Sequence, residues 1–162
     1  MHKVYIGIGS NLEKERNIHS CISMLRKNYE NIILSPVYET ESMGFDGPNF
    51  YNLVSSFNTK EDIYSLKEQL KKIENSHGRN FNESKFSSRT LDIDILYYDD
   101  LILSNEKISI PRKEIIEYDF VLKPLIDIAG DFIHPSLNIS HLEIMKNHNI
   151  KKQIISEISL DL

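Results

Sequence analysis

The sequence is poor in the features that mark several large classes of protein. It contains a single cysteine, Cys21, so no disulfide can form within the chain, and a reducing compartment fits this usage. No apolar run approaches the roughly 20 residues that are needed to cross a membrane. The N-terminus runs directly into a strand pattern and lacks the layout of a signal peptide. We therefore expect a cytoplasmic protein with no membrane partner.

An excess of basic residues is also missing. The formal net charge is -5 at pH 7, which disfavours nucleic acid and anionic membrane as bulk partners, because both require a basic surface. A nucleotide is not excluded, since it needs only a local basic pocket. The 162 residues are 40% hydrophobic and 27% charged, which predicts one globular domain over residues 1–162.

The most informative stretch is 89–96, which reads Arg-Thr-Leu-Asp-Ile-Asp-Ile-Leu. Its aliphatic and acidic residues alternate with the period of two that a pleated strand imposes. Asp92 and Asp94 therefore point to the same side of this strand, opposite a face that belongs in a core. Two carboxylates this close repel each other unless a positive charge lies between them, and a divalent cation is the usual solution.

Basic side chains precede these two aspartates. Arg79, Lys85 and Arg89 lie in or beside a polar stretch, 78–88, that has few core residues. Guanidinium groups beside paired carboxylates favour a phosphate chain bridged by magnesium, with the metal on the aspartates and the phosphate oxygens on the arginines. The alternative is that these residues form salt bridges at an exposed sheet edge, where such pairs contribute little to stability. The aliphatic opposite face and the two arginines favour the metal–phosphate interpretation.

Periodicity along the rest of the chain predicts a β-α-β-β-α-β order. The expected strands are 4–8, 32–40, 51–58 and 89–96, and apolar stripes at helical spacing follow the first and third of them. This order is typical of the split, ferredoxin-like unit. We therefore expect an α+β fold, a ferredoxin-like α/β sandwich whose mostly antiparallel sheet carries helices on its faces.

Several other segments are less decisive. The loop 41–49, with aromatic residues in and after it, could form a flat slot for a planar ligand or could simply cap the core. Beyond the second half-unit the pattern predicts a short hairpin within 101–110, a short helix or turn over 112–119 and a buried turn over 125–129. Residues 151–162 fit a helix or a strand.

Three histidines, His134, His141 and His148, are seven residues apart. No acidic or cysteine partner completes a metal-ligand set with them. We therefore expect solvated surface side chains at these positions.

Five patches of the sequence together resemble one known family. They are Tyr5-Ile6-Gly7-Ile8-Gly9-Ser10-Asn11-Leu12, Ser35-x-x-Tyr38-x-Thr40, Pro48-x-Phe50-x-Asn52, Arg79 with the stretch 88–95, and Phe120-Val121-Leu122-x-Pro124-Leu125. In this order they resemble 6-hydroxymethyl-7,8-dihydropterin pyrophosphokinase, an enzyme of folate biosynthesis. The resemblance covers residues 4–135, and the fourth patch is close to a family signature.

The resemblance implies a monomeric enzyme that transfers the pyrophosphoryl group of ATP to the pterin hydroxymethyl and releases AMP. It implies that Asp92 and Asp94 bind two magnesium ions and that Arg79 and Arg89 are catalytic residues that bind phosphate. The residues it implies for ATP are Glu74, Arg79, Arg89, Ile95, Lys107 and Arg112. Those it implies for the pterin are Asn11, Thr40, Met43, Gly44, Phe50, Asn52 and Phe120, with Phe120 as one ring of an aromatic sandwich and the other ring near Phe45 or Phe50.

The chain departs from the family pattern at a few positions. Arg112 follows Pro111 where the family usually has a histidine, and Tyr118 stands where an arginine is usual. Ser87-Ser88 replaces a Gly-Pro pair. All four residues nearest the implied chemistry remain, which favours a variant of the family over a loss of function.

Two alternatives belong to other functional classes. The chain could be a binding module that holds a pterin or nucleotide without turnover, although such a module has no need of two charged metal ligands. It could also be a ferredoxin-like nucleotidyltransferase, which would release pyrophosphate in place of AMP.

Overall fold

The computed structural model describes residues 1–78 and 91–162, and an antiparallel sheet forms its centre. The sheet has six strands: five lie in the order β5-β1-β4-β3-β8, and the sixth, β2, pairs with β4. Every pairing in this sheet is antiparallel. The strands are β1 (His2–Ser10), β2 (Glu30–Leu34), β3 (Val37–Thr40), β4 (Phe50–Thr59), β5 (Asp92–Tyr98) and β8 (Ile154–Ile158).

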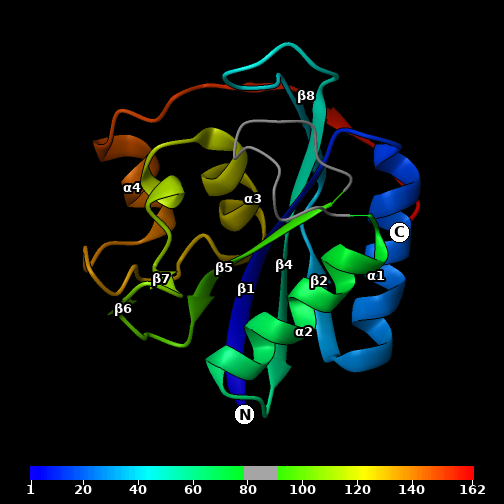
Figure 1. Ribbon diagram of the computed structural model, residues 1–162. Helices are drawn as coiled ribbons and strands as arrows, with labels where there is room; N and C mark the ends of the chain where they lie inside the picture. The colour runs from blue at the N-terminus through cyan, green and yellow to red at the C-terminus, as the bar shows by residue number, and fades with distance from the viewer. Residues whose placement is uncertain (79–90) are drawn as a thin grey trace.

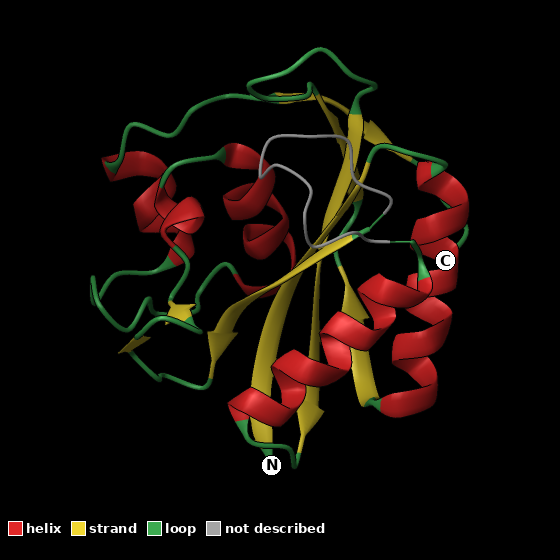
Figure 2. Ribbon diagram, viewed as in Figure 1, coloured by secondary structure: helices red, strands yellow, loops and turns green. Residues whose placement is uncertain are grey.

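Helices cover both faces of the sheet (Figure 1). Helices α1 (Lys14–Asn28) and α2 (Ile63–Ser76) pack on one face, and α3 (Asp119–Ala129) and α4 (His141–Asn147) pack on the other (Figure 2). A short hairpin, β6 (Leu103–Ser104) and β7 (Ser109–Ile110), and a 3-10 turn, η1 (Lys113–Ile116), connect β5 to α3. The expected β-α-β-β-α-β order and the ferredoxin-like α+β class are confirmed, except that the second strand breaks at Ser35-Pro36 into β2 and β3.

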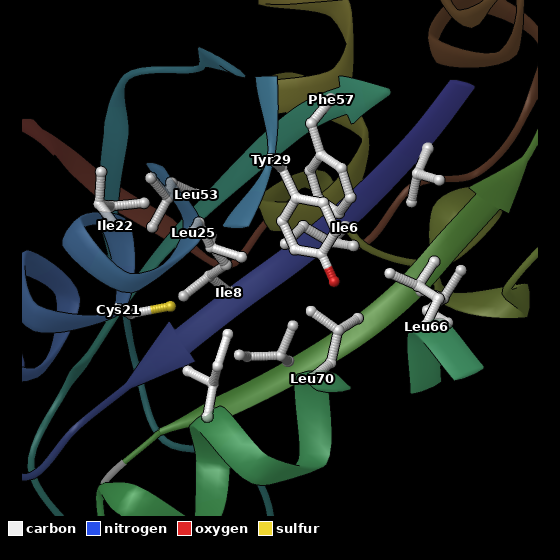
Figure 3. Close-up of a cluster of buried hydrophobic side chains, with 14 of the residues drawn as sticks. Ile6, Ile8, Cys21, Ile22, Leu25, Tyr29, Leu53, Phe57, Leu66 and Leu70 are labelled. Atoms are coloured by element: carbon white, nitrogen blue, oxygen red, sulfur yellow. The ribbon is translucent and has the colours of Figure 1, made fainter. Parts of the chain in front are cut away.

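The larger core lies between the sheet and the pair α1 and α2. Every second residue of β1 enters it, beginning with Val4, because alternate side chains of a strand point to the same face. The rings of Tyr29 and Phe57 stack there with centroids 4.2 Å apart, and Cys21 is completely buried in the same core, near Ile8 and Leu25 (Figure 3). Cys21 is thus a packing residue, as its place in the apolar stripe of α1 predicts.

The second core lies under α3 and α4, and a bulge in β5 supplies part of it. Tyr5 pairs with Tyr97 while Ile6 pairs with Ile95, so Leu96 is an extra residue on β5. The extra residue places both Leu96 and Tyr97 on the α3 side, while Ile95 remains on the side of α1 and α2.

Two expectations for the C-terminal third are wrong. Residues 125–129, expected as a turn, are the second half of α3, even though Pro124 lies within the helix. A proline removes one backbone hydrogen bond, but the helix buries Val121, Leu122 and Leu125, and packing of an apolar face supplies most of a helix's stability. Residues 151–162, for which helix and strand were both open, contain strand β8. The Asp119 carboxylate fixes the start of this strand by accepting hydrogen bonds from the N–H groups of Gln153 and Ile154.

The histidines are the second error. His134 and His141 are buried, with exposures of 5% and 0%. The Nδ1 of His141 lies 2.7 Å from the Ala129 carbonyl oxygen, and its Nε2 lies 2.9 Å from the Tyr97 hydroxyl. A carbonyl can only accept, so Nδ1 donates and Nε2 accepts, which is the neutral imidazole. The sequence could not reveal this, because the partners come from β5 and from the end of α3.

Burial and the nearby His134 lower the pKa of His141 to about 4, although the hydrogen bond to Ala129 acts in the opposite direction. The unfolded chain therefore binds the proton more readily, and the stabilisation is complete above pH 6.5 and lost as the pH falls towards 4. We predict that, between pH 7.5 and 5, the free energy of unfolding falls by about 2 kcal/mol more in the wild type than in His141→Gln. Urea unfolding of both proteins at each pH measures this difference, and parallel losses would contradict it.

Candidate functional site

Two cavities meet at the exposed edge of β5. One, of about 360 Å³, lies on the α3 side and is called here the aromatic cavity. The other, of about 250 Å³, lies between α2, β5 and the β6–β7 hairpin and is called the basic cavity. Asp92, Asp94 and Arg112 line both of them. Any group held at these three side chains can therefore touch ligands in both cavities.

The backbone of β1 leaves space in front of the two aspartates. Gly9 pairs with Asp92 and Gly7 with Asp94, so no β1 side chain stands beside either carboxylate on this face. Ile93 and Ile95 point the other way into the core, which fixes the carboxylates on the cavity side. The Asp94 side chain remains 43% exposed. The sequence prediction that both aspartates share one face, opposite an aliphatic core, is confirmed.

The aromatic cavity combines rings with one amide. Phe45, Phe50, Tyr118 and Phe120 line it together with Asn52. The Tyr118 and Phe120 rings stack at 5.2 Å with an interplanar angle of 19°. Flat apolar walls with a single oriented amide suit a planar heterocycle that carries hydrogen-bonding groups at its edge.

The Asn52 amide is held in a fixed orientation. Its Nδ2 donates to the Thr40 hydroxyl at 2.8 Å. A methyl group at Gly9 would lie 2.7 Å from the Asn52 Oδ1, so the amide oxygen occupies the space that the glycine leaves open. Thr40, Met43, Phe50, Asn52 and Phe120, which the family resemblance assigns to the pterin, all line the cavity.

The basic cavity contains more cations than the sequence analysis identified. Lys67 and Lys71 of α2 line it with Lys107 and Arg112. Burial, followed by repulsion from Lys71 and Arg112, lowers the pKa of Lys67. Like charges gathered in one cavity destabilise each other, and an anionic ligand would relieve the repulsion. The missed signal is spacing: Lys67, Lys71 and Glu74 recur at i, i+4 and i+7 on one face of the helix.

Glu74 fixes the edge strand from the side of α2. It is buried, and its Oε2 accepts the N–H of Ile93 at 2.9 Å. That N–H belongs to the residue between the two aspartates, so Glu74 anchors β5 where their geometry is set. Together with Ile95, Lys107 and Arg112 it lines the basic cavity, which brings together every predicted ATP residue that the structure describes.

Other predicted residues lie elsewhere. Within the described ranges, Asn11 and Gly44 line neither cavity. The Asn11 Nδ2 donates to the Pro48 carbonyl oxygen at 3.1 Å, which supports the loop preceding Phe50. Arg79 and Arg89 lie outside the described residues.

The side chains at β5 suit a magnesium ion that is bound partly by water and substrate. They do not suit a metal that is enclosed entirely by protein ligands. Over residues 1–78 and 91–162, no three acidic, histidine or cysteine side chains gather into a metal site. Two carboxylates with open space before them match the way Mg²⁺ is held by one or two carboxylates, water and substrate phosphates. Asp92 and Asp94 would hold such an ion, and the remaining ligands would come from a phosphorylated substrate.

Comparison with known proteins places the chain in a family. The model of the family 7,8-dihydro-6-hydroxymethylpterin-pyrophosphokinase (HPPK) matches residues 5–130. The chain belongs to the HPPK family. The resemblance drawn from five sequence patches is thereby confirmed.

Individual relatives differ in how much of their length this HPPK chain covers. The folic acid synthesis protein fol1 of Pneumocystis carinii is 36% identical over 154 residues, which are 91% of this chain and 21% of that protein. The 2-amino-4-hydroxy-6-hydroxymethyldihydropteridine pyrophosphokinase of Haemophilus influenzae is 32% identical over 143 residues, 86% of this chain and 89% of that protein. The chain thus spans about a fifth of the first relative and most of the second.

Solved structures support the HPPK fold. The crystal structure of wild-type Plasmodium falciparum HPPK-DHPS with SDX-DHP superposes with a TM-score of 0.69 at 16% identity, over 90% of this chain and 43% of that one. None of the helices in the described part of this HPPK chain is long and apolar enough to span a membrane.

The contact between Gly9 and Asn52 yields a structural prediction. Gly9→Ala places a methyl group against the Asn52 amide oxygen, so we expect the amide to shift and its hydrogen bond to Thr40 to break. Side-chain amide resonances of Asn52 in NMR spectra report this change. Gly7→Ala is the matched control, because its methyl would lie at an ordinary 3.6 Å from the Leu96 side chain. Unchanged Asn52 resonances in Gly9→Ala would contradict the described contact.

Proposed function

We propose that this HPPK chain transfers the β,γ-pyrophosphoryl group of ATP to the hydroxymethyl group of 6-hydroxymethyl-7,8-dihydropterin and releases AMP. The observation that carries the proposal is the meeting of two unlike cavities at Asp92 and Asp94. One cavity has the rings and amide that suit a pterin, and the other has the cations that suit a triphosphate. The name of the Haemophilus influenzae relative describes the same activity.

The aromatic cavity is the proposed pterin site. The pterin ring would lie between Phe120 and the rings of Phe45 and Phe50, whose centroids are 6.4 Å apart at 87°. Asn52, held by Thr40, offers an amide oxygen as acceptor to the donor edge of the heterocycle. The ring would thereby be fixed with its hydroxymethyl group directed towards the aspartates, where transfer occurs. Asn11 and Gly44, which line neither cavity, would act through the loop that carries Phe45.

The basic cavity is the proposed site for the triphosphate. Lys67, Lys71, Lys107 and Arg112 would neutralise phosphate oxygens there. The pterin hydroxyl oxygen attacks the β-phosphorus, the bond from that phosphorus to the α–β bridging oxygen breaks, and AMP leaves while the hydroxyl proton is lost. Such a transfer requires mainly positioning and charge neutralisation from a protein. Arg79 and Arg89, which lie outside the described residues, are proposed as additional phosphate ligands on the strength of the family resemblance.

Asp92 and Asp94 are the proposed ligands of two magnesium ions. When bound, magnesium supplies charge neutralisation at the transferring phosphates and a template for in-line attack. The aspartates would hold the ions at the junction of the cavities, and the core residues Ile93 and Ile95 keep both carboxylates on that side.

The first test is the product itself. Incubation with ATP, magnesium and the hydroxymethylpterin should yield AMP, detected by mass spectrometry, and no AMP should form without the pterin. Tight pterin binding by calorimetry without AMP would instead identify a binding module. Pyrophosphate as the released product would identify a nucleotidyltransferase.

Asp94→Ala tests the metal assignment. Loss of this carboxylate should lower kcat at least about a thousandfold, because phosphoryl-group transfer depends on charge neutralisation at the metal, and the variant should remain folded by circular dichroism. Asp100→Asn is the control, since it removes the same charge from an exposed turn just beyond β5. Full activity in Asp94→Ala would exclude Asp94 as a metal ligand.

Lys71→Gln tests the basic cavity. Removal of this cation should raise the KM for ATP at least about tenfold, the size expected for loss of one charge-assisted contact, and should leave the KM for the pterin unchanged. Lys72→Gln is matched to it, because Lys72 is the next residue of α2 and is exposed to solvent. Equal effects of the two substitutions on ATP would argue against a phosphate site between α2 and β5.

A further inference from the structure

An acid–base pair follows the β6–β7 hairpin and lies directly at the junction of the two cavities. The guanidinium of Arg112 contacts Glu114 at two points, Nε to Oε2 at 3.1 Å and Nη2 to Oε1 at 3.3 Å. The Arg112 and Glu114 side chains are only 32% and 19% exposed. A partly buried contact at two points fixes the plane of a guanidinium, whereas a contact at a single point would leave the group free to rotate.

The backbone around the pair is anchored on both sides of the sheet. Ile110 is buried in the core under α1 and α2, whereas Ile115 is buried in the core under α3. The short segment between them therefore passes around the outer edge of β5, where the Arg112 N–H donates to the Leu96 carbonyl oxygen at 3.3 Å. This path explains why Arg112 lines both cavities.

Arg112 also has a competing partner. Its Nη2 lies 3.9 Å from the Oδ1 of Asp94. A guanidinium that closed onto Asp94 would take up carboxylate oxygens that a cation needs, and its charge would repel that cation. The Glu114 carboxylate contacts the guanidinium at closer range, through Nε and through the same Nη2 that faces Asp94.

We propose that Glu114 is a positioning residue that holds Arg112 away from Asp94. It keeps the Asp94 carboxylate accessible to a divalent cation and presents the guanidinium to a phosphate group. This inference rests on the proposed function, because it assigns Glu114 a role in the same site. Glu114 itself touches neither metal nor phosphate, and it acts only through Arg112.

The test measures cation binding directly, apart from turnover. Mn²⁺ replaces magnesium, and electron paramagnetic resonance reports its Kd in the presence of α,β-methylene-ATP, which cannot release AMP. Glu114→Gln should raise this Kd about tenfold, as expected for loss of one coupled ionic contact. Glu114→Asp retains the carboxylate, so its Kd for Mn²⁺ should lie between those of the wild type and Glu114→Gln. Glu30→Gln, on an exposed residue at the start of β2, should match the wild type.

A double-mutant cycle decides whether Glu114 acts through Arg112. In an Arg112→Ala background, adding Glu114→Gln should change the Mn²⁺ Kd less than about twofold, because the guanidinium to be positioned is gone. The proposal is overturned if Glu114→Gln has the same effect in both backgrounds or no effect in either. If the wild type itself neither binds Mn²⁺ with the analogue nor forms AMP, the proposed function fails. If the wild type does both and Glu114→Gln behaves like it, only the role of Glu114 fails.

Discussion

The site depends on the pleat of one edge strand. In β5 the isoleucines on either side of Asp94 are packed into the core under α1 and α2, so the aspartates must face away from it. The carboxylate of Glu74 then binds the one N–H that lies between them, which an edge strand would otherwise expose. Moving β5 by one residue would turn both carboxylates into the core and two isoleucines into the cavities. Hydrophobic packing on one face thus determines the electrostatics on the other.

The two cores, one on each face of the sheet, surround β5 with different side chains on its two sides. Because α2 covers one face and α3 the other, the edge of β5 borders a helix with lysines on one side and an aromatic helix end on the other. The bulge at Leu96 lets the consecutive residues Leu96 and Tyr97 enter the α3 core without disturbing the alternation at the aspartates. The segment from Ile110 to Ile115 then closes the open edge. A single strand can therefore serve as the border between two binding cavities.

Short-range pattern was enough to predict the elements around the site but not the contacts across it. The alternation of Asp92 and Asp94 with aliphatic residues, and the stripe of α2, are periodic signals, and both were confirmed. The sequence pattern did not predict helix α3, because Pro124 interrupts it, whereas the buried face around the proline stabilises the helix. The burial of His141 and the clamp of Glu114 on Arg112 depend on residues brought together by tertiary packing or by a turn of particular shape. Lys67 and Lys71 could have been found, since they share a helix face with Glu74.

The charge distribution explains how an acidic chain can accommodate a polyanion. The net charge of -5 opposes nucleotide binding at long range. Around the basic cavity, however, Lys67, Lys71, Lys107 and Arg112 face Glu74, Asp92 and Asp94, so that cations and acids nearly balance locally. Under the proposed function, a bare triphosphate or a bare cation would bind weakly here, because each would leave one set of charges unbalanced. A nucleotide that arrives with magnesium satisfies both sets at once, and the attraction is strong only within the Debye length of about 8 Å at physiological salt. The proposed site would therefore favour the metal–nucleotide complex over either component alone, through local pairing that the overall charge does not reveal.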